Sequence, residues 1–319
     1  MAPAGTGWLS SALRAQSAAA SALLAVFCVA GLAGVPFGMG VQLALLLGGM
    51  ALVGVPHGAF DHLVAQPVMR PRLGPAWWAL FGAGYFGLAA LVGMAWWAAP
   101  GWTLCGFLAA SIVHFGLGDL EDGLAPASVP RGLAVLAYGA LPVLLPVALH
   151  PDAAAPVLAG LAGMAVPDMA AALRPAVWLL PAWAVLFGWV VFTARYRGVA
   201  ERLLTAAAFV LLPPLLAFAL YFTAGHAMRH IVRLGAWYDP ADRGRAARWL
   251  AWTIVPWAFG TALAGVALAW RGDDLTASVL VPAFQAIAAL TLPHMVVTSW
   301  LMRLGPTCAP PRLHHQRHG

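Results

Sequence analysis

Six histidines lie within or at the edges of long apolar segments of this chain, in the stretches GVPHGAFDHL, SIVHFGLGDL, FTAGHAMRHIVR and LTLPHMVVTSW. Ionisable side chains are costly inside a membrane and are candidate functional residues by default. Neutral imidazole is a ligand for iron, copper, zinc and nickel. The sequence therefore predicts a transition-metal site. The six residues are His57, His62, His114, His226, His230 and His294.

The spacing of these histidines separates predicted ligands from supporting residues. His226 and His230 are four residues apart, so on a helix they share one face and can bind the same ion. His57 and His62 are five residues apart, and a continuous α-helix directs such a pair more than a quarter turn apart. His57 is the predicted ligand, while His62 and His294 are predicted supporting residues.

Two aspartates lie close to the histidines in the sequence. Asp61 and Asp119 follow His57 and His114 by four and five residues. A carboxylate can accept a hydrogen bond from the second ring nitrogen of a ligating histidine and so fix its tautomer and orientation. The alternative interpretation is that both aspartates cap the ends of membrane spans in the headgroup region.

The remaining four histidines are predicted to lie outside the metal site. His150, in ALHPDA, reads as a loop residue. His314, His315 and His318 belong to the polar stretch RLHHQRHG at the C-terminus.

The composition indicates an integral membrane protein. Of 319 residues, 62% are hydrophobic and 9% are charged, whereas about 25% are charged in a soluble domain. Apolar runs of about 20 residues, long enough to cross a hydrocarbon core of about 30 Å, recur along the chain. They cover 17–35, 38–56, 77–99, 102–118, 130–149, 176–194, 203–227, 247–270 and 276–302. The predicted fold is an all-α, polytopic helix bundle of about 8–10 transmembrane helices with the histidines between them.

The charged residues and cysteines exclude other classes of protein. All 17 basic residues are arginines and most lie between apolar runs, where they anchor and orient membrane spans. The net charge of +6 therefore gives no indication of nucleic-acid binding. Cys28, Cys105 and Cys308 form no C-x-x-C pair, so neither a disulfide framework nor a thiolate metal site is predicted.

The predicted organisation is a single transmembrane helical domain at 17–303. An N-terminal polar segment, 1–16, precedes it and a polar C-terminal tail, 304–319, follows it. Segment 153–173 is apolar but short and interrupted by prolines, so it can cross the membrane, re-enter or lie at the interface.

The orientation depends on that segment. If 153–173 crosses and the N-terminus is cytoplasmic, thirteen arginines lie inside and four outside. If it does not cross, eight arginines lie inside and nine outside. The excess of arginine in cytoplasmic loops favours the crossing. The crossing would also bring His226 and His230 to the leaflet of His57 and His114. The sequence thus predicts a multi-pass protein of the bacterial inner membrane with its metal site toward the cytoplasmic leaflet.

The motifs PHGAFDH, HFGLGD, GHAMRH and PHM occur in this order over most of the chain. In this combination the chain resembles the Brp/Blh family, bacteriorhodopsin-related membrane proteins that act as β-carotene 15,15'-dioxygenases. The resemblance implies an enzyme that uses non-haem Fe(II) and O2 to split β-carotene at its central double bond into two retinals. It also implies that His57, His114, His226 and His230 bind the iron, and that an opsin in the same cell receives the retinal.

This chemistry agrees with the residue types. Four neutral imidazoles leave up to two of six coordination positions of an iron ion open, and no protein carboxylate or thiolate is needed. β-Carotene has no hydrogen-bonding groups, so apolar contacts must recognise it, and it can enter sideways from the membrane lipid. The candidate substrate-binding residues near the histidines are Phe60, Phe115, Tyr221, Phe222, Met228 and Met295.

Two other classes remain as alternatives. A di-iron membrane desaturase or hydroxylase acting on a lipid or carotenoid carries about eight histidines with an H-x-x-H-H box, which this chain lacks. A haem protein or metal transporter without oxygenase activity is the other, but the chain has no C-x-x-C-H motif. Its intramembrane polar residues also gather toward one side, whereas a transporter needs them along a whole path.

Overall fold

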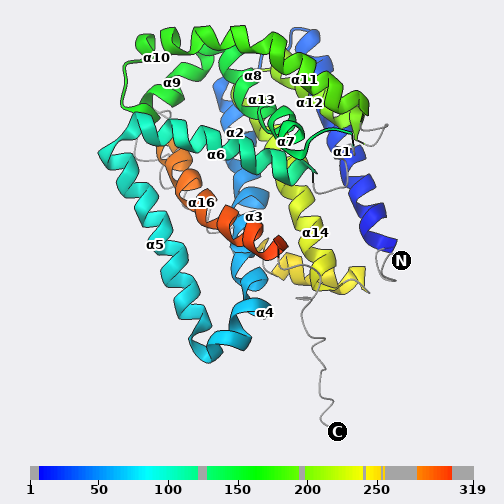
Figure 1. Cartoon of the computed structure of the whole chain (residues 1–319). Coiled ribbons are helices and arrows are strands. Elements are labelled where there is room, and N and C mark those ends of the chain that lie inside the picture. The colour runs from blue at the N-terminus through cyan, green and yellow to red at the C-terminus, as the bar shows by residue number, and fades with distance from the viewer. Residues whose placement is uncertain are drawn as a thin grey trace.

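The computed structural model describes residues 7–120, 128–193, 198–239, 242–252, 254–255 and 279–303. Every regular element in these ranges is a helix (Figure 1). The first half contains α1 (Gly7–Leu32), α2 (Met39–Gly49), η1 (Met50–Gly54), α3 (Val55–Ala59), α4 (Asp61–Leu73), η2 (Gly74–Ala76), α5 (Trp77–Ala98), α6 (Pro100–Leu120), α7 (Arg131–Gly139) and α8 (Leu141–Leu149). The second half contains α9 (Pro151–Ala162), α10 (Val166–Leu173), η3 (Arg174–Leu179), α11 (Leu180–Thr193), α12 (Val199–Leu211), α13 (Pro214–Leu220), η4 (Tyr221–Ala227), α14 (Met228–Tyr238) and α16 (Val281–Arg303). Residues 243–252 are also helical.

The outer surface of the bundle is apolar. Trp97, Trp102 and Trp178 are 89%, 83% and 82% exposed, although soluble proteins rarely expose large apolar patches. Five helical stretches of the described residues are long and apolar enough to span a membrane, or six if the bent pair α7 and α8 is one span. The five are Trp8–Leu32, Met39–Ala98, Pro100–Leu120, Val166–Thr193 and Val281–Ser299. The prediction of an all-α, multi-pass membrane protein is confirmed.

Two of these stretches contain bends. The stretch Met39–Ala98 reverses at Gly74, whose φ of 55° ends α4, so that α5 returns beside α4 (Figure 1). The α7–α8 pair bends by 44°. Beside this bend α6 and α7 approach so closely that a Cβ added at Gly139 would overlap the backbone carbonyl of Ile112.

Segment 153–173, whose crossing the sequence left open and the arginine distribution favoured, is not one of the candidate spans of the described residues. The chain there forms two short helices, α9 and α10, which pack against each other across a turn at Gly163 (φ 66°). The 12 residues of α9 rise only about 18 Å at about 1.5 Å per residue. Helix α10 instead continues through η3 into α11, and the three together form the spanning stretch Val166–Thr193.

The predicted run 203–227 is not one crossing either. Pro213 forces the preceding residue into an extended conformation, and Leu212, with φ −112° and ψ 156°, ends α12. Helix α12 runs beside α1 toward the C-terminal end of α1, where Leu211 and Leu212 contact Gly31. The chain then runs back along α1 through α13 and η4, and Gly235 of α14 lies close to Trp8 near the start of α1.

This reversal changes the number of crossings that was counted from the sequence between His114 and His226. It returns His226 to the level at which α12 begins, so no crossing at 153–173 is needed to bring His226 to His114. The count of thirteen arginines inside and four outside no longer holds either. That count places Arg202 outside and Arg229 inside, yet both bind the same carboxylate, Asp119.

The predicted segment boundaries differ at the N-terminus. Helix α1 begins at Gly7, so the later part of the predicted polar segment 1–16 is helical and packs in the bundle. The predicted tail 304–319 and most of the predicted run 247–270 lie outside the described residues. These differences explain why about 8–10 spans were predicted, whereas the described residues contain five or six candidate spans.

Candidate metal centre

Five histidines from five helical elements meet in the interior of the bundle. They are His57 of α3, His114 of α6, His226 of η4, His230 of α14 and His294 of α16, and they are called the histidine cluster below. Ring centroids are 4.4 Å apart for His57 and His230, 4.7 Å for His57 and His294, and 5.0 Å for His114 and His226. Segments separated by more than 200 residues thus contribute to one site.

The cluster consists of two overlapping groups of potential ligands. His57, His230 and His294 form one group, and His57, His114 and His226 form the other, with ligand nitrogens within 4.8 Å of one another in each. His226 and His230, predicted from their spacing to act as a pair, therefore belong to different groups that share His57.

Wide helical turns present two of these histidines. The π-helix η4 contains His226, and the π-helix η1 ends three residues before His57. A π-helical turn forms i→i+5 hydrogen bonds and occurs frequently at functional sites. The two turns lie against each other, and a side chain at Gly49 would clash with Thr223. The small residue allows the two wide turns to meet beside the cluster.

The spacing of the ring nitrogens fits a transition-metal ion. The Nε2 atoms of His57 and His294 are 3.1 Å apart, and those of His226 and His114 are 3.2 Å apart. An ion with metal–nitrogen bonds of about 2.1 Å at right angles holds two nitrogens about 3.0 Å apart. His230 Nε2 is buried without a hydrogen-bond partner, which is expected of an atom that binds a metal ion.

Both predicted carboxylates lie at the cluster, but each contacts a histidine on a different helix from the one expected. Asp61 Oδ1 is 2.8 Å from His294 Nδ1, and Asp119 Oδ1 is 3.8 Å from His226 Nδ1. His57 and Asp61 lie on separate helices, α3 and α4. His114 and Asp119 are five residues apart on α6, which directs them more than a quarter turn apart. Each carboxylate therefore serves the histidine of the facing helix, which spacing along the sequence cannot identify.

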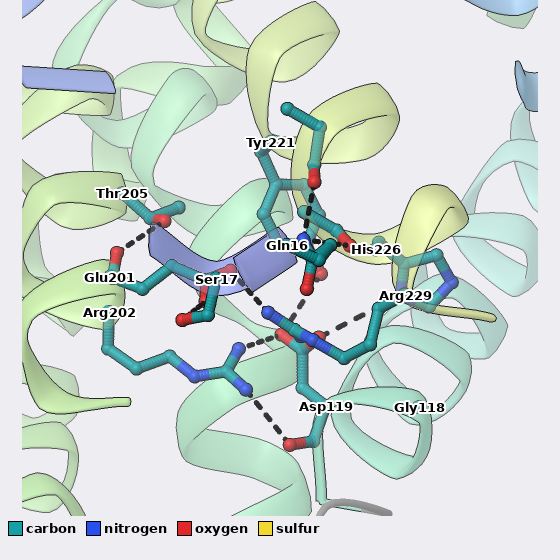
Figure 2. A network of polar contacts seen from close by, with 12 residues as sticks. Gln16, Ser17, Gly118, Asp119, Glu201, Arg202, Thr205, Tyr221, His226 and Arg229 are labelled. Atoms are coloured by element: carbon teal, nitrogen blue, oxygen red, sulfur yellow. Dashed lines mark hydrogen bonds and ion pairs between the residues drawn. The ribbon is translucent and has the colours of Figure 1, made fainter. Parts of the chain in front are cut away.

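Asp119 is the centre of a buried network of ion pairs (Figure 2). It pairs with Arg202 and with Arg229, whose Nη1 is 3.1 Å from Asp119 Oδ1, and Arg229 also pairs with Glu201. All four side chains are at most 5% exposed. Two acids and two arginines balance, and the network, named the Asp119 network here, fixes the carboxylate that faces His226.

Helix α1 closes the Asp119 network from the other side. Gln16 donates a hydrogen bond of 2.6 Å to the carbonyl of Ala224 in η4, and Ser17 donates one to Glu201. The Tyr221 hydroxyl lies 3.3 Å from Asp119 Oδ2. Gln16, Glu201 and Arg202 were not predicted from the sequence to belong to the site. The adjacent acid and base at 201 and 202, directly before an apolar run, were the signal for a buried ion pair.

A cavity of about 1200 Å³ reaches the histidine cluster, and its wall includes His57, His114 and His294. Its lining is almost entirely apolar. One part extends to Gln42 on α2, about 22 Å from His57 along the helix axis at about 1.5 Å per residue. Another extends to Trp77 at the start of α5, about 12 Å from Tyr85 by the same rise. The cavity therefore continues on both sides of the cluster.

Two of the predicted substrate-binding residues, Phe115 and Phe222, line this cavity. The other four do not line it. Phe60 is fully buried and packs on Trp249, and the Tyr221 hydroxyl bonds to Asp119. Met228 and Met295 are not among the residues that line the cavity.

The other predicted histidines lie apart from the cluster. His62 is exposed at the cavity edge, and its Nδ1 is 2.9 Å from the carbonyl of Ala59. His150 lies in the link between α8 and α9, as expected, and its Nε2 is 2.9 Å from the carbonyl of Phe209. His314, His315 and His318 fall outside the described residues.

The fold and the site define a class of protein, namely a multi-pass helical membrane protein with a histidine-rich metal site in the wall of a large apolar cavity. The chain belongs to the β-carotene 15,15'-dioxygenase family, because the family model of that description matches residues 48–302. The probable β-carotene 15,15'-dioxygenase Blh of Halobacterium salinarum is 30% identical over 312 residues, which cover 88% of this chain and 90% of that relative. No solved structure matches the chain.

Gly118 gives the first test of the site geometry. A Cβ added there would lie 2.7 Å from His226 Cε1, so Gly118→Ala must displace this ring. Disturbing the groups that orient a ligating histidine lowers metal affinity about 10–100-fold. We expect a loss of that order, measured by metal titration of the purified protein. Gly106→Ala on the same helix, with open space around the site of substitution, is the matched control. Equal affinity of the two variants would contradict the geometry.

The Asp119 network gives the second test. Asp119→Asn leaves Arg202 and Arg229 facing Glu201 alone, and breaking a buried ion pair costs about 3–5 kcal/mol. We expect a loss of unfolding free energy of this size in a denaturant titration in detergent. Asp152→Asn is the control, because Asp152 pairs with Arg174 on the surface, where such a pair contributes about 0–1 kcal/mol. A similar small loss in both variants would show that the network is not structural.

Proposed function

We propose that this protein cleaves β-carotene with O2 at its central 15,15' double bond to give two molecules of retinal, and that a non-haem Fe(II) ion held by His57, His114, His226 and His230 performs the reaction. The observation that carries the proposal is the position of the histidine cluster in the wall of a large apolar cavity, in a chain of the β-carotene 15,15'-dioxygenase family.

The donor set supports iron. The cluster offers only imidazole nitrogens, and its two nearest carboxylates face histidines: Asp61 hydrogen-bonds to His294, and Asp119 lies 3.8 Å from His226 Nδ1. Imidazole suits Fe(II) along with other late metals, and the reaction of the family requires a metal that reacts with O2. Bound Fe(II) would supply the one-electron chemistry that allows O2 to react with an alkene.

The cavity supports cleavage at the centre of a long polyene. Because the cavity continues on both sides of the histidine cluster, toward Gln42 and toward Trp77, a symmetric substrate can extend both halves away from the metal. Phe115 and Phe222, which line the cavity next to the cluster, offer apolar surface to the polyene. The apolar lining also excludes water from the reacting double bond.

We further propose that the protein resides in the bacterial cell membrane with the arginine-rich end of the bundle in the cytoplasm. Exposed arginines are concentrated on the first part of α1, the end of α4 and residues 243–252, which lie toward the lower end in Figure 1. Helix α10, which ends directly before Arg174, lies toward the opposite end. Positively charged segments remain cytoplasmic. β-Carotene would enter from the membrane lipid, and the retinal would pass to an opsin.

Expression in bacteria that accumulate β-carotene tests the reaction. We expect the orange colour to fade and chromatography of the extracted pigments to show retinal as the product. Longer apocarotenals would contradict central cleavage. Intact β-carotene in cells that contain folded, iron-loaded protein would contradict the substrate.

Histidine variants test the proposed iron site. His226→Ala and His230→Ala each remove an imidazole from the cluster, so we expect iron content and turnover to fall together. His150→Ala should retain both, because His150 lies outside the cluster. One iron per chain is expected by elemental analysis, whereas two would favour a di-iron oxygenase. A His230→Ala protein with full iron and full turnover would exclude His230 as a ligand.

A further inference from the structure

We propose that His294 is a fifth nitrogen ligand of the metal, oriented by Asp61, and that Tyr85 positions Asp61 at the cavity wall. This inference rests on the proposed function and extends its ligand set. The three residues come from α16, α4 and α5, and neither Tyr85 nor a ligand role for His294 follows from the sequence motifs.

Hydrogen bonding determines which nitrogen of His294 faces the cluster. Asp61 contacts His294 Nδ1 through both oxygens, at 2.8 Å and 3.0 Å. A carboxylate only accepts hydrogen bonds, so Nδ1 carries the proton, and in the neutral imidazole that can bind a metal Nε2 carries the lone pair. That Nε2 lies 3.1 Å from His57 Nε2, and His294 belongs to the group formed with His57 and His230. The lone pair of His294 therefore points into the metal site.

The same arrangement occurs on the other side of the cluster. Asp119 faces His226 Nδ1, and His226 Nε2 lies 3.2 Å from His114 Nε2. Each side of the cluster, called an arm here, consists of a carboxylate, a histidine whose Nδ1 faces it, and a second histidine. The Nε2 atoms of the two histidines are about 3 Å apart. Since His226 is one of the proposed ligands and His294 occupies the equivalent place in the second arm, the geometry assigns both the same role.

The two carboxylates, Asp119 and Asp61, differ in the positive charges that surround them. This difference is an independent argument that His294 binds the metal. Asp119 is neutralised by Arg202 and Arg229. Asp61 is only 2% exposed, and its partners among the described residues are Tyr85 and His294, with no arginine. Buried charges are paired or coordinate metals. We infer that the metal on the far side of the His294 ring supplies the positive charge that balances Asp61.

Tyr85 holds Asp61 in place. Its hydroxyl donates a hydrogen bond of 2.9 Å to Asp61 Oδ2, and both residues line the cavity with His294. The contact joins α5 to α4 and thereby fixes the carboxylate against α16. Tyr85 is a positioning residue, because it acts on the metal through Asp61 and His294.

The test measures metal binding by the full chain in detergent without oxygen. Fe(II) is titrated against a competing chelator, and X-ray absorption counts the imidazoles around the ion. We expect five in the wild type and four in His294→Ala. Asp61→Asn should lower Fe(II) affinity about 10–100-fold, the usual effect of removing such a partner. Tyr85→Phe should lower it less. Tyr238→Phe, which removes a hydroxyl from a residue stacked on Trp249 away from the cluster, should leave it unchanged.

An unchanged imidazole count in His294→Ala would overturn the ligand role. If that variant does not fold, Asp61→Asn decides, since its side chain has the same shape, and wild-type affinity in it would overturn the inference. A wild type with five imidazoles that leaves β-carotene intact would support the fifth ligand and refute the proposed reaction. A wild type that cleaves β-carotene with four imidazoles would refute only the fifth ligand. A wild type that binds no Fe(II) would refute both.

Discussion

The neutralisation of Asp119 inside the bundle is the constraint on which the rest of the site depends. A carboxylate in a low-dielectric interior is costly unless it is paired and hydrogen-bonded. Arg202 and Arg229 supply the charges, and Glu201 balances the second arginine. The pairing requires α6, α12 and α14 to meet at one level, and this meeting brings His114, His226 and His230 together. The ion pairs thus determine which helices can surround the metal.

The arrangement also explains why an enzyme for an apolar substrate contains so many polar residues. The cavity wall is almost entirely apolar, so it can hold a hydrocarbon but cannot orient a metal. His226 is oriented by the Asp119 network, whose four residues do not line the cavity, whereas Asp61, which contacts His294, lies in the cavity wall with Tyr85. Charged residues therefore support the histidines from behind on one side of the cluster and from within the cavity wall on the other.

The sequence predicted the class of fold and the residues that gather at the metal better than the path of the chain. His57, His114, His226 and His230 stand out because an imidazole in an apolar run has few other uses, and the four do converge. The reversal at Leu212 and Pro213 was not predicted, because a proline within an apolar run is equally compatible with a kinked span. Asp61 was placed near the site but against His57, because spacing along one helix does not report which side chain faces it from another. Tyr85 belongs to none of the sequence motifs. Its position beside Asp61 depends on the turn at Gly74 that brings α5 back along α4.

Helix α1 has a consequence for how the protein assembles. The region that matches the family model begins at residue 48, yet Gln16 and Ser17 of α1 reach Ala224 and Glu201. These partners are separated by 208 and 184 positions along the chain, so α1 leaves the ribosome long before its partners exist. Its polar side chains must stay unsatisfied, or bound to lipid headgroups or water, until α12 and η4 are inserted. The metal site therefore becomes complete only late in synthesis, and α1, made much earlier than its partners, takes part in one of the last steps.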